Sequence, residues 1–161
     1  MRTIKIETAA VIIFLIVLVV SFMLNELSPR VETVDQEYVK AHVGKPGFIL
    51  VDTRSEEIFN GKSPGPGIPG GHIDGAVNFP LDDIGINAAP AALAGSGLTK
   101  KVILILYCNS GVSSGKFAEM LVNEYGYDPL KVKSYRGSVM DWVKDPYNKL
   151  YPEDHESGLD F

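Results

Sequence analysis

The chain has 161 residues, which is enough for one domain of ordinary size and a short extension. Its formal net charge is -5, and no basic run is interleaved with aromatic residues, so nucleic acid is excluded as an expected partner. A single cysteine excludes an intrachain disulfide. No cluster of Cys and His has zinc-ligand spacing, so we expect no metal and no cofactor.

Residues 1–28 are predicted to form a signal anchor, that is, an uncleaved transmembrane helix. Arg2 and Lys5 precede an apolar segment from Ala9 to Leu24, which would rise roughly 24 Å as a helix, close to the thickness of a hydrocarbon core. No Ala-x-Ala-like site follows it, which favours an anchor over a cleaved signal. We therefore expect a single-pass protein of the inner cell membrane, with residues 29–161 facing the periplasm or the cell exterior. Secretion after signal cleavage is the alternative.

The first half of the domain alternates between helix and strand signals. In chain order the expected elements are a helix capped by Asp35 and running to about Val43, a buried strand over Phe48–Val51, a short helix capped by Ser55, a loop rich in Gly and Pro over residues 62–70, and a turn with a short strand within residues 71–80.

The second half continues the alternation. Its expected elements are a broken helix within residues 81–98, a buried strand over residues 102–107, a helix with Phe117 and Leu121 on its apolar face, a strand over Val132–Tyr135, a helix holding Trp142, and a polar tail from residue 146. Strands that alternate with helices predict an α/β fold, with a parallel sheet covered by helices on both faces.

Cys108, the single cysteine, directly follows the long apolar strand. A tight loop rich in Gly and Ser comes next and leads into a helix, so the backbone N–H groups of the loop and the positive helix end would surround the sulfur. Such a position lowers the pKa of a thiol, and the thiolate is the reactive form. Position alone leaves a buried structural cysteine equally open, because most lone cysteines are of that kind.

Three motifs resemble the rhodanese (sulfurtransferase) domain family, over a stretch from about Val34 to Pro152. Asp52-Thr53-Arg54 resembles its Asp-x-Arg motif, and residues 71–80 (GHIDGAVNFP) are similar to its Gly-His-Ile-x-Gly-Ala-x-Asn-x-Pro segment. The third comprises Tyr107-Cys108 with Gly111, then Gly137 and Trp142. The resemblance implies a rhodanese-like three-layer fold around a central parallel sheet of about five strands, with the active site at the carboxyl ends of the strands.

The resemblance also implies roles for individual residues. Cys108 would be the nucleophile, which attacks a sulfane sulfur and holds it as a persulfide. The active-site loop would bind the thiolate, the persulfide and a departing anion through its N–H groups; it consists of Asn109, Ser110, Gly111, Val112, Ser113 and Ser114. The supporting residues would be Asp52 and Arg54 as an ion pair or anchor, His72 as a residue that fixes a turn, and Trp142 as core packing.

This chain departs from the family's common loop, Cys-Arg-x-Gly-x-Arg, because Asn109 and Ser113 stand at the two arginine positions. A guanidinium suits a dianionic donor such as thiosulfate, and an amide or hydroxyl does not replace its charge. The same departure counts against a phosphatase or arsenate reductase, since phosphoryl chemistry in such a loop needs the arginine. Lys116, Arg136 and Arg54 are the candidate replacement cations.

The leading hypothesis from the sequence is a membrane-tethered sulfurtransferase or persulfide carrier. It would take sulfane sulfur from a small donor and pass it to a thiol, to cyanide or to a protein acceptor. The alternative is a non-catalytic rhodanese-like module that binds a partner or an anion. The presence of Cys108 favours the enzyme, and the absence of both loop arginines favours the binding module.

Overall fold

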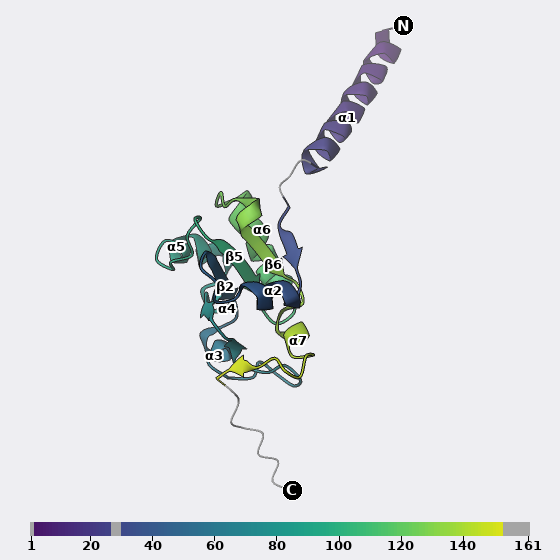
Figure 1. Cartoon of the computed structure of the whole chain (residues 1–161). Helices are drawn as coiled ribbons and strands as arrows, with labels where there is room; N and C mark the ends of the chain where they lie inside the picture. Colours follow the sequence, from purple (N-terminus) through teal and green to yellow (C-terminus); the bar gives the residue numbers. More distant parts are fainter. Residues whose placement is uncertain (1, 27–29, 153–161) are drawn as a thin grey trace. The chain divides into compact units, whose positions relative to one another are not determined.

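The computed structural model describes the backbone of residues 2–26 and 30–152 (Figure 1). The chain divides into two compact units, Met1–Arg30 and Val31–Phe161. The first unit holds one helix, α1 (Arg2–Glu26). The expected transmembrane anchor within residues 1–28 is not confirmed: over the described part of the chain, no helix combines the length and the apolarity that a membrane span requires.

The second unit is built on a five-stranded sheet in the order β1-β6-β5-β2-β4. Every pair of neighbouring strands is parallel. The strands are β1 (Glu32–Val34), β2 (Phe48–Asp52), β4 (Ala76–Asn78), β5 (Ile103–Tyr107) and β6 (Val132–Tyr135). The α/β class and the five-stranded parallel sheet predicted from the sequence are therefore confirmed, and β5, which leads to Cys108, lies at the centre.

The helices and 3-10 turns of this unit are short, apart from one helix of twelve residues that follows β5. They are α2 (Gln36–His42), α3 (Glu56–Phe59), α4 (Leu81–Ile84), the 3-10 turn η1 (Ile86–Ala88), α5 (Ala89–Leu93), α6 (Val112–Asn123), the 3-10 turn η2 (Pro129–Lys131) and α7 (Ser138–Trp142). The two predicted caps form. Asp35 accepts a hydrogen bond from the N–H of Tyr38 at 2.9 Å, and Ser55 accepts one from the N–H of Ile58 at 3.4 Å.

Side chains of β5 alternate between two buried clusters, one on each face of the sheet. Leu104 and Leu106 pack with Phe117 of α6 in the first cluster, and α4 and α5 contribute to the same layer. Ile105 and Tyr107 pack in the second cluster, which contains residues of α2 and α7. Because successive side chains of a strand point to opposite faces, a continuous apolar run is the pattern that a strand covered on both sides requires.

Two strands, β1 and β7 (Leu150–Tyr151), are not predicted from the sequence. In β1 only Val34 is buried, so the three residues show no apolar pattern, and pairing with β6 defines the strand. Its Glu32 forms an ion pair with Lys133 of β6, with 2.5 Å between Nζ and Oε2. The tail also contains β7 (Leu150–Tyr151), which pairs antiparallel with β3 (His72–Ile73). Two residues are too few to carry a periodicity.

Candidate active site

Cys108 is the first residue after β5, at the carboxyl edge of the sheet, and only 4 % of its surface is exposed. Its Sγ accepts a hydrogen bond from the backbone N–H of Gly111 at 3.1 Å and one from the hydroxyl of Ser114 at 3.4 Å. Both donors come from the turn that opens α6. The sulfur thus lies among donors aimed at a developing or full negative charge.

The path of the active-site loop depends on Gly111. Its φ of +80° lies in the left-handed region, and a Cβ at this position would lie 2.1 Å from the carbonyl oxygen of Arg136. Only glycine accommodates both this conformation and this approach. The close packing on Arg136 directs the N–H of Gly111 towards Cys108, so the glycine at the family's motif position has a direct geometric role here.

The pKa of the Cys108 thiol lies below its ordinary value. Burial raises this pKa, because the charged thiolate loses hydration. Hydrogen bonds from the hydroxyls of Ser113 and Ser114, and from the backbone N–H groups of Ser114 and Ser110, lower it and outweigh burial. A thiolate is therefore more available at neutral pH than in a free cysteine.

Arg54 lies fully buried behind the loop and makes an ion pair with Asp52. Its Nε donates to Asp52 Oδ1 at 3.0 Å, and its Nη2 donates to Asp52 Oδ2 at 2.6 Å and to the carbonyl of Gly71 at 2.5 Å. Its Nη1 lies 3.4 Å from Oδ1 of Asn109. The guanidinium thus joins the end of β2, the segment before β3 and the active-site loop.

The amino end of α7 supports the loop from the other side, through a residue that the sequence did not single out. Ser138 is fully buried, and its hydroxyl accepts a hydrogen bond from the N–H of Cys108 at 3.2 Å and donates one to the carbonyl of Tyr135 at 2.8 Å. The carbonyl oxygens of Cys108 and Asn109 accept from the N–H groups of the next two residues of α7. Gly137-Ser138 in the late family motif is the signal that could have indicated this contact.

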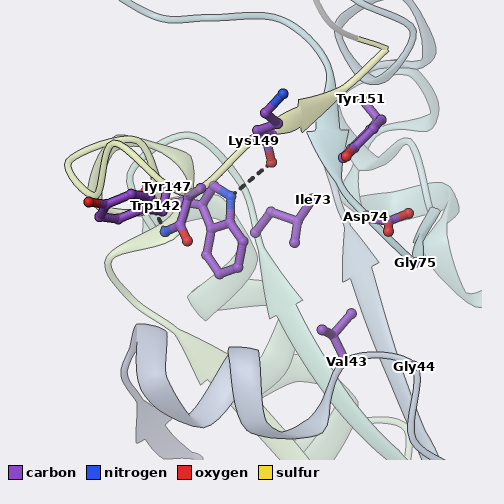
Figure 2. A pocket seen from close by; sticks show the side chains of 10 residues that line it. Val43, Gly44, Ile73, Asp74, Gly75, Trp142, Tyr147, Lys149 and Tyr151 are labelled. Carbon is purple, nitrogen blue, oxygen red and sulfur yellow. Dashed lines mark hydrogen bonds between the residues drawn. The ribbon is translucent and has the colours of Figure 1, made fainter.

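His72 and Trp142 make their contacts elsewhere. The Nδ1–H of His72 donates to the carbonyl of Phe59 at 2.9 Å, and the two rings stack with their centroids 3.7 Å apart. The indole N–H of Trp142 donates to the carbonyl of Lys149 at 3.1 Å, beside a cavity of about 300 Å³ (Figure 2). No hydrogen bond joins either side chain to the active-site loop among the residues that the structure describes.

The remaining loop residues and the candidate cations lie nearer to solvent. Ser110 and Val112 are exposed, and Asn109 and Ser113 are half-buried. Lys116 and Arg136 are also exposed, and both line a cavity of about 230 Å³ that Gly111 borders. Within residues 2–26 and 30–152, no group of three His, Cys, Asp or Glu side chains is arranged to hold a metal ion.

A cysteine at the carboxyl edge of a parallel sheet, with N–H and hydroxyl donors converging on its sulfur, defines a site for thiolate chemistry. The family model of the rhodanese-like domain matches residues 35–145, more than half of the chain. The chain belongs to the rhodanese family.

A curated relative agrees with this assignment. The chain is 32% identical, over 111 residues, to a Mycobacterium tuberculosis protein named "Putative thiosulfate sulfurtransferase SseB". The match covers 64% of this chain and 38% of the relative, so the chain spans well under half of that protein.

The fold is similar to that of wild-type EanB, with a TM-score of 0.65, 19% identity, and coverage of 76% of this chain and 28% of that one. An anaerobic ergothioneine biosynthesis enzyme from Chlorobium limicola, solved with trimethyl histidine, gives a TM-score of 0.64 at 20% identity, covering 75% and 28%. At these identities the likeness concerns the fold.

Proposed function

We propose that the protein is a sulfurtransferase or persulfide carrier whose nucleophile is Cys108. The observation that carries the proposal is the set of donors on Sγ: the N–H of Gly111 and the hydroxyl of Ser114, in a setting that lowers the pKa of the thiol. The relative named as a thiosulfate sulfurtransferase supports the reaction class.

The first half of the reaction loads sulfur onto the enzyme. The Cys108 thiolate attacks the sulfane sulfur of a donor, a bond forms between Sγ and that sulfur, and the bond from that sulfur to the rest of the donor breaks. The electron pair of the broken bond leaves with the donor, as sulfite from thiosulfate or as a thiolate from a persulfide. Cys108 then carries one additional sulfur, which the surrounding N–H groups hold as an anion.

The missing loop arginines bear on which sulfur donor this chain uses. No loop guanidinium is available at positions 109 and 113, and the Arg54 guanidinium is already engaged with Asp52 and Gly71. A dianion therefore meets hydroxyls and backbone dipoles in the loop rather than paired cations. We propose persulfides and polysulfides as better donors than thiosulfate.

Mass spectrometry of the intact protein tests the central step. After incubation with polysulfide, the wild-type chain should gain one sulfur atom, which cyanide or an added thiol then removes. Cys108→Ser should gain none. A wild-type chain that stays unmodified with polysulfide, an organic persulfide and thiosulfate would overturn the proposal in favour of the non-catalytic binding module.

The location of the domain is a separate proposal, supported by the sequence alone. We propose that residues 29–161 lie outside the cytoplasm, because Arg2 and Lys5 precede the apolar segment Ala9–Leu24. Protease added to spheroplasts should degrade the domain while a cytoplasmic marker survives. N-terminal sequencing of the mature protein then separates a retained segment from a cleaved one, and a domain that resists the protease contradicts the proposal.

A further inference from the structure

A groove beside the active-site loop has no part in the mechanism described above. Its volume is about 230 Å³, and it lies between α6 and the edge of the sheet formed by β1 and β6. Gly111 borders it at the end nearest the catalytic sulfur, and Lys116 and Arg136 contribute its cations. Among the described residues that line the groove, Glu119, one turn further along α6, is the only acid, so these residues carry a net positive charge.

The lack of a side chain at Gly115 keeps the groove open. Gly115 lies in the first turn of α6, although glycine within a helix costs about 1 kcal/mol relative to alanine. A Cβ at this position would meet the Ser134 hydroxyl at 3.5 Å, which is ordinary contact, so the fold does not itself require glycine. The space exists because residue 115 has no side chain.

The polar side chains of Lys116, Arg136 and Ser134, which line the groove, have no partner among the residues that the structure describes. Among the described residues, the side chains of Lys116 and Arg136 form no ion pair or hydrogen bond. Ser134 is only 8 % exposed, and its hydroxyl likewise has no partner within the described part of the chain. No buried side-chain oxygen or nitrogen of the described residues lacks a partner, so the Ser134 hydroxyl opens onto the groove. There it lies with two unpaired cations, and together these groups offer hydrogen-bond donors to an anionic ligand.

We propose that this groove binds the carboxylate or sulfonate of a small anionic thiol, which accepts sulfur from Cys108. The inference rests on the proposed function and extends it to the class of acceptor. The volume lies below the range of about 300–1,000 Å³ typical of pockets for drug-sized ligands, so it suits one charged arm of a small molecule. Gly111 connects the two sites, since its N–H contacts Sγ and the same residue borders the groove.

The transfer step balances without an added oxidant. The acceptor thiolate attacks the outer sulfur of the Cys108 persulfide, and a new sulfur–sulfur bond forms on the acceptor. The bond between that sulfur and Sγ breaks, and its electron pair stays on Cys108, which leaves as a thiolate stabilised by the loop donors. Holding the acceptor's anion in the groove brings its thiolate to the active site as part of one bound molecule.

The kinetic test compares two acceptors that differ in charge, 3-mercaptopropionate and 2-mercaptoethanol, with polysulfide as donor. In the double variant Lys116→Gln with Arg136→Gln, we expect KM for 3-mercaptopropionate to rise about three- to tenfold, with kcat unchanged. KM for 2-mercaptoethanol should not change. The control Lys45→Gln with Lys101→Gln removes the same charge at two exposed lysines outside the groove, and both KM values should stay at the wild-type level.

Two further variants separate charge from shape. Lys116→Glu with Arg136→Glu should reverse the preference, so that cysteamine, a cationic thiol, becomes a better acceptor than 3-mercaptopropionate. Gly115→Ala should leave the fold at least as stable, because alanine favours the helix, and yet raise KM for 3-mercaptopropionate by narrowing the groove. Equal losses with anionic and neutral acceptors in the glutamine variant would overturn the inference.

A binding measurement makes the groove testable apart from sulfur transfer. The unreactive thioether 3-(methylthio)propionate should shift the amide NMR signals of Gly115 and Ser134 in the wild-type protein, and less so in the double glutamine variant. The neutral alcohol 3-(methylthio)propanol should shift neither. Probe binding without any sulfur transfer would contradict the proposed sulfurtransferase function but not the proposal that the groove binds an anion. Sulfur transfer without charge-dependent probe binding would overturn the groove.

Discussion

The guanidinium Nη1 of Arg54 lies 3.4 Å from the amide oxygen of Asn109, and the same side chain is paired with Asp52. A cation buried behind the active-site loop thus contacts the residue at the first of the family's two arginine positions. An arginine at 109 would set a second guanidinium beside the first. The asparagine at this position accepts a hydrogen bond where an arginine would bring like charges together.

Removing the buried cation should destabilise the domain strongly. Arg54→Ala leaves Asp52 buried without its partner, so we expect the free energy of unfolding to fall by about 3–5 kcal/mol in urea titrations. Arg136→Ala, at an exposed arginine, should change it by about 0.5 kcal/mol or less. Arg54→Lys should not restore stability, because an ammonium does not reproduce the planar fork that reaches Asp52, Gly71 and Asn109. Equal losses in Arg54→Ala and Arg136→Ala would contradict this account.

Adding charge to the loop should select for thiosulfate. A charge-assisted hydrogen bond is worth about 1.5–3 kcal/mol, so Ser113→Arg should raise kcat/KM for thiosulfate by roughly tenfold or more, with little effect on a neutral persulfide donor. Asn109→Arg should give a smaller gain, because it removes the contact with Arg54 and sets two cations together. Steady-state kinetics with both donors measures this. Brisk wild-type turnover of thiosulfate at low concentration would show that another cation already serves the site.

Gly111 should tolerate no side chain. A comparison with Gly97 separates the effect of backbone strain from the effect of the close contact with Arg136. Gly97 has φ +77° and open space around it, so Gly97→Ala should lose only about 1–2 kcal/mol of stability from backbone strain. Gly111→Ala adds a collision with the Arg136 carbonyl to a similar strain and should lose at least about 3 kcal/mol. Urea unfolding of the two variants gives the comparison, and losses of the same size would mean that the close approach to Arg136 is unimportant.

At position 138 we expect the glycine variant to be more stable than the alanine variant, which reverses their usual order in a helix. Its φ of +52° is unfavourable for residues with a Cβ, by about 1–2 kcal/mol, so Ser138→Gly relieves strain while losing the hydroxyl. Ser138→Ala keeps the strain and also loses the hydrogen bonds to Cys108 and Tyr135. We expect the alanine variant to be less stable than the glycine variant by about 1 kcal/mol in thermal unfolding. At Ser113, on α6, alanine should be the more stable of the two.

The reactivity of Cys108 should depend on pH through the Ser114 hydroxyl. The rate of alkylation by iodoacetamide should rise with a midpoint below the ordinary thiol pKa in the wild-type protein, and the midpoint should move upwards in Ser114→Ala. Ser110→Ala is the control, since it keeps the backbone N–H that contributes to the lowering. A midpoint that stays unchanged in Ser114→Ala would exclude the hydroxyl as a cause.

The lowered pKa of Cys108 also makes the free energy of unfolding depend on pH. Because the pKa of Cys108 is lower in the folded than in the unfolded state, the thiolate stabilises the fold fully above the unfolded pKa, and this contribution is lost as pH falls through the folded pKa. The difference in unfolding free energy between the wild type and Cys108→Ala should therefore change in favour of the wild type as pH rises across that window. A difference that is constant with pH would contradict the lowered pKa.

The sequence by itself determined the class of fold and the position of Cys108 at the end of a buried strand. The apolar run before Cys108 predicts a strand covered on both faces, and the following Gly and Ser residues predict the turn into α6, because both patterns are local. The family motifs are also local in sequence, and the family that they indicated is confirmed by the match to residues 35–145. The expected transmembrane helix rested on the apolarity and length of one segment and on the cations before it, and the structure did not bear it out.

Only the tertiary structure decided what surrounds the sulfur. Ser138 reaches the N–H of Cys108 across 30 residues of sequence, and Arg54 reaches Asn109 across 55. The groove between Lys116 and Arg136 likewise requires α6 to lie against β6. Such contacts depend on the order of strands in the sheet and on the packing of helices over it, and neither leaves a periodic signal in the residues that meet.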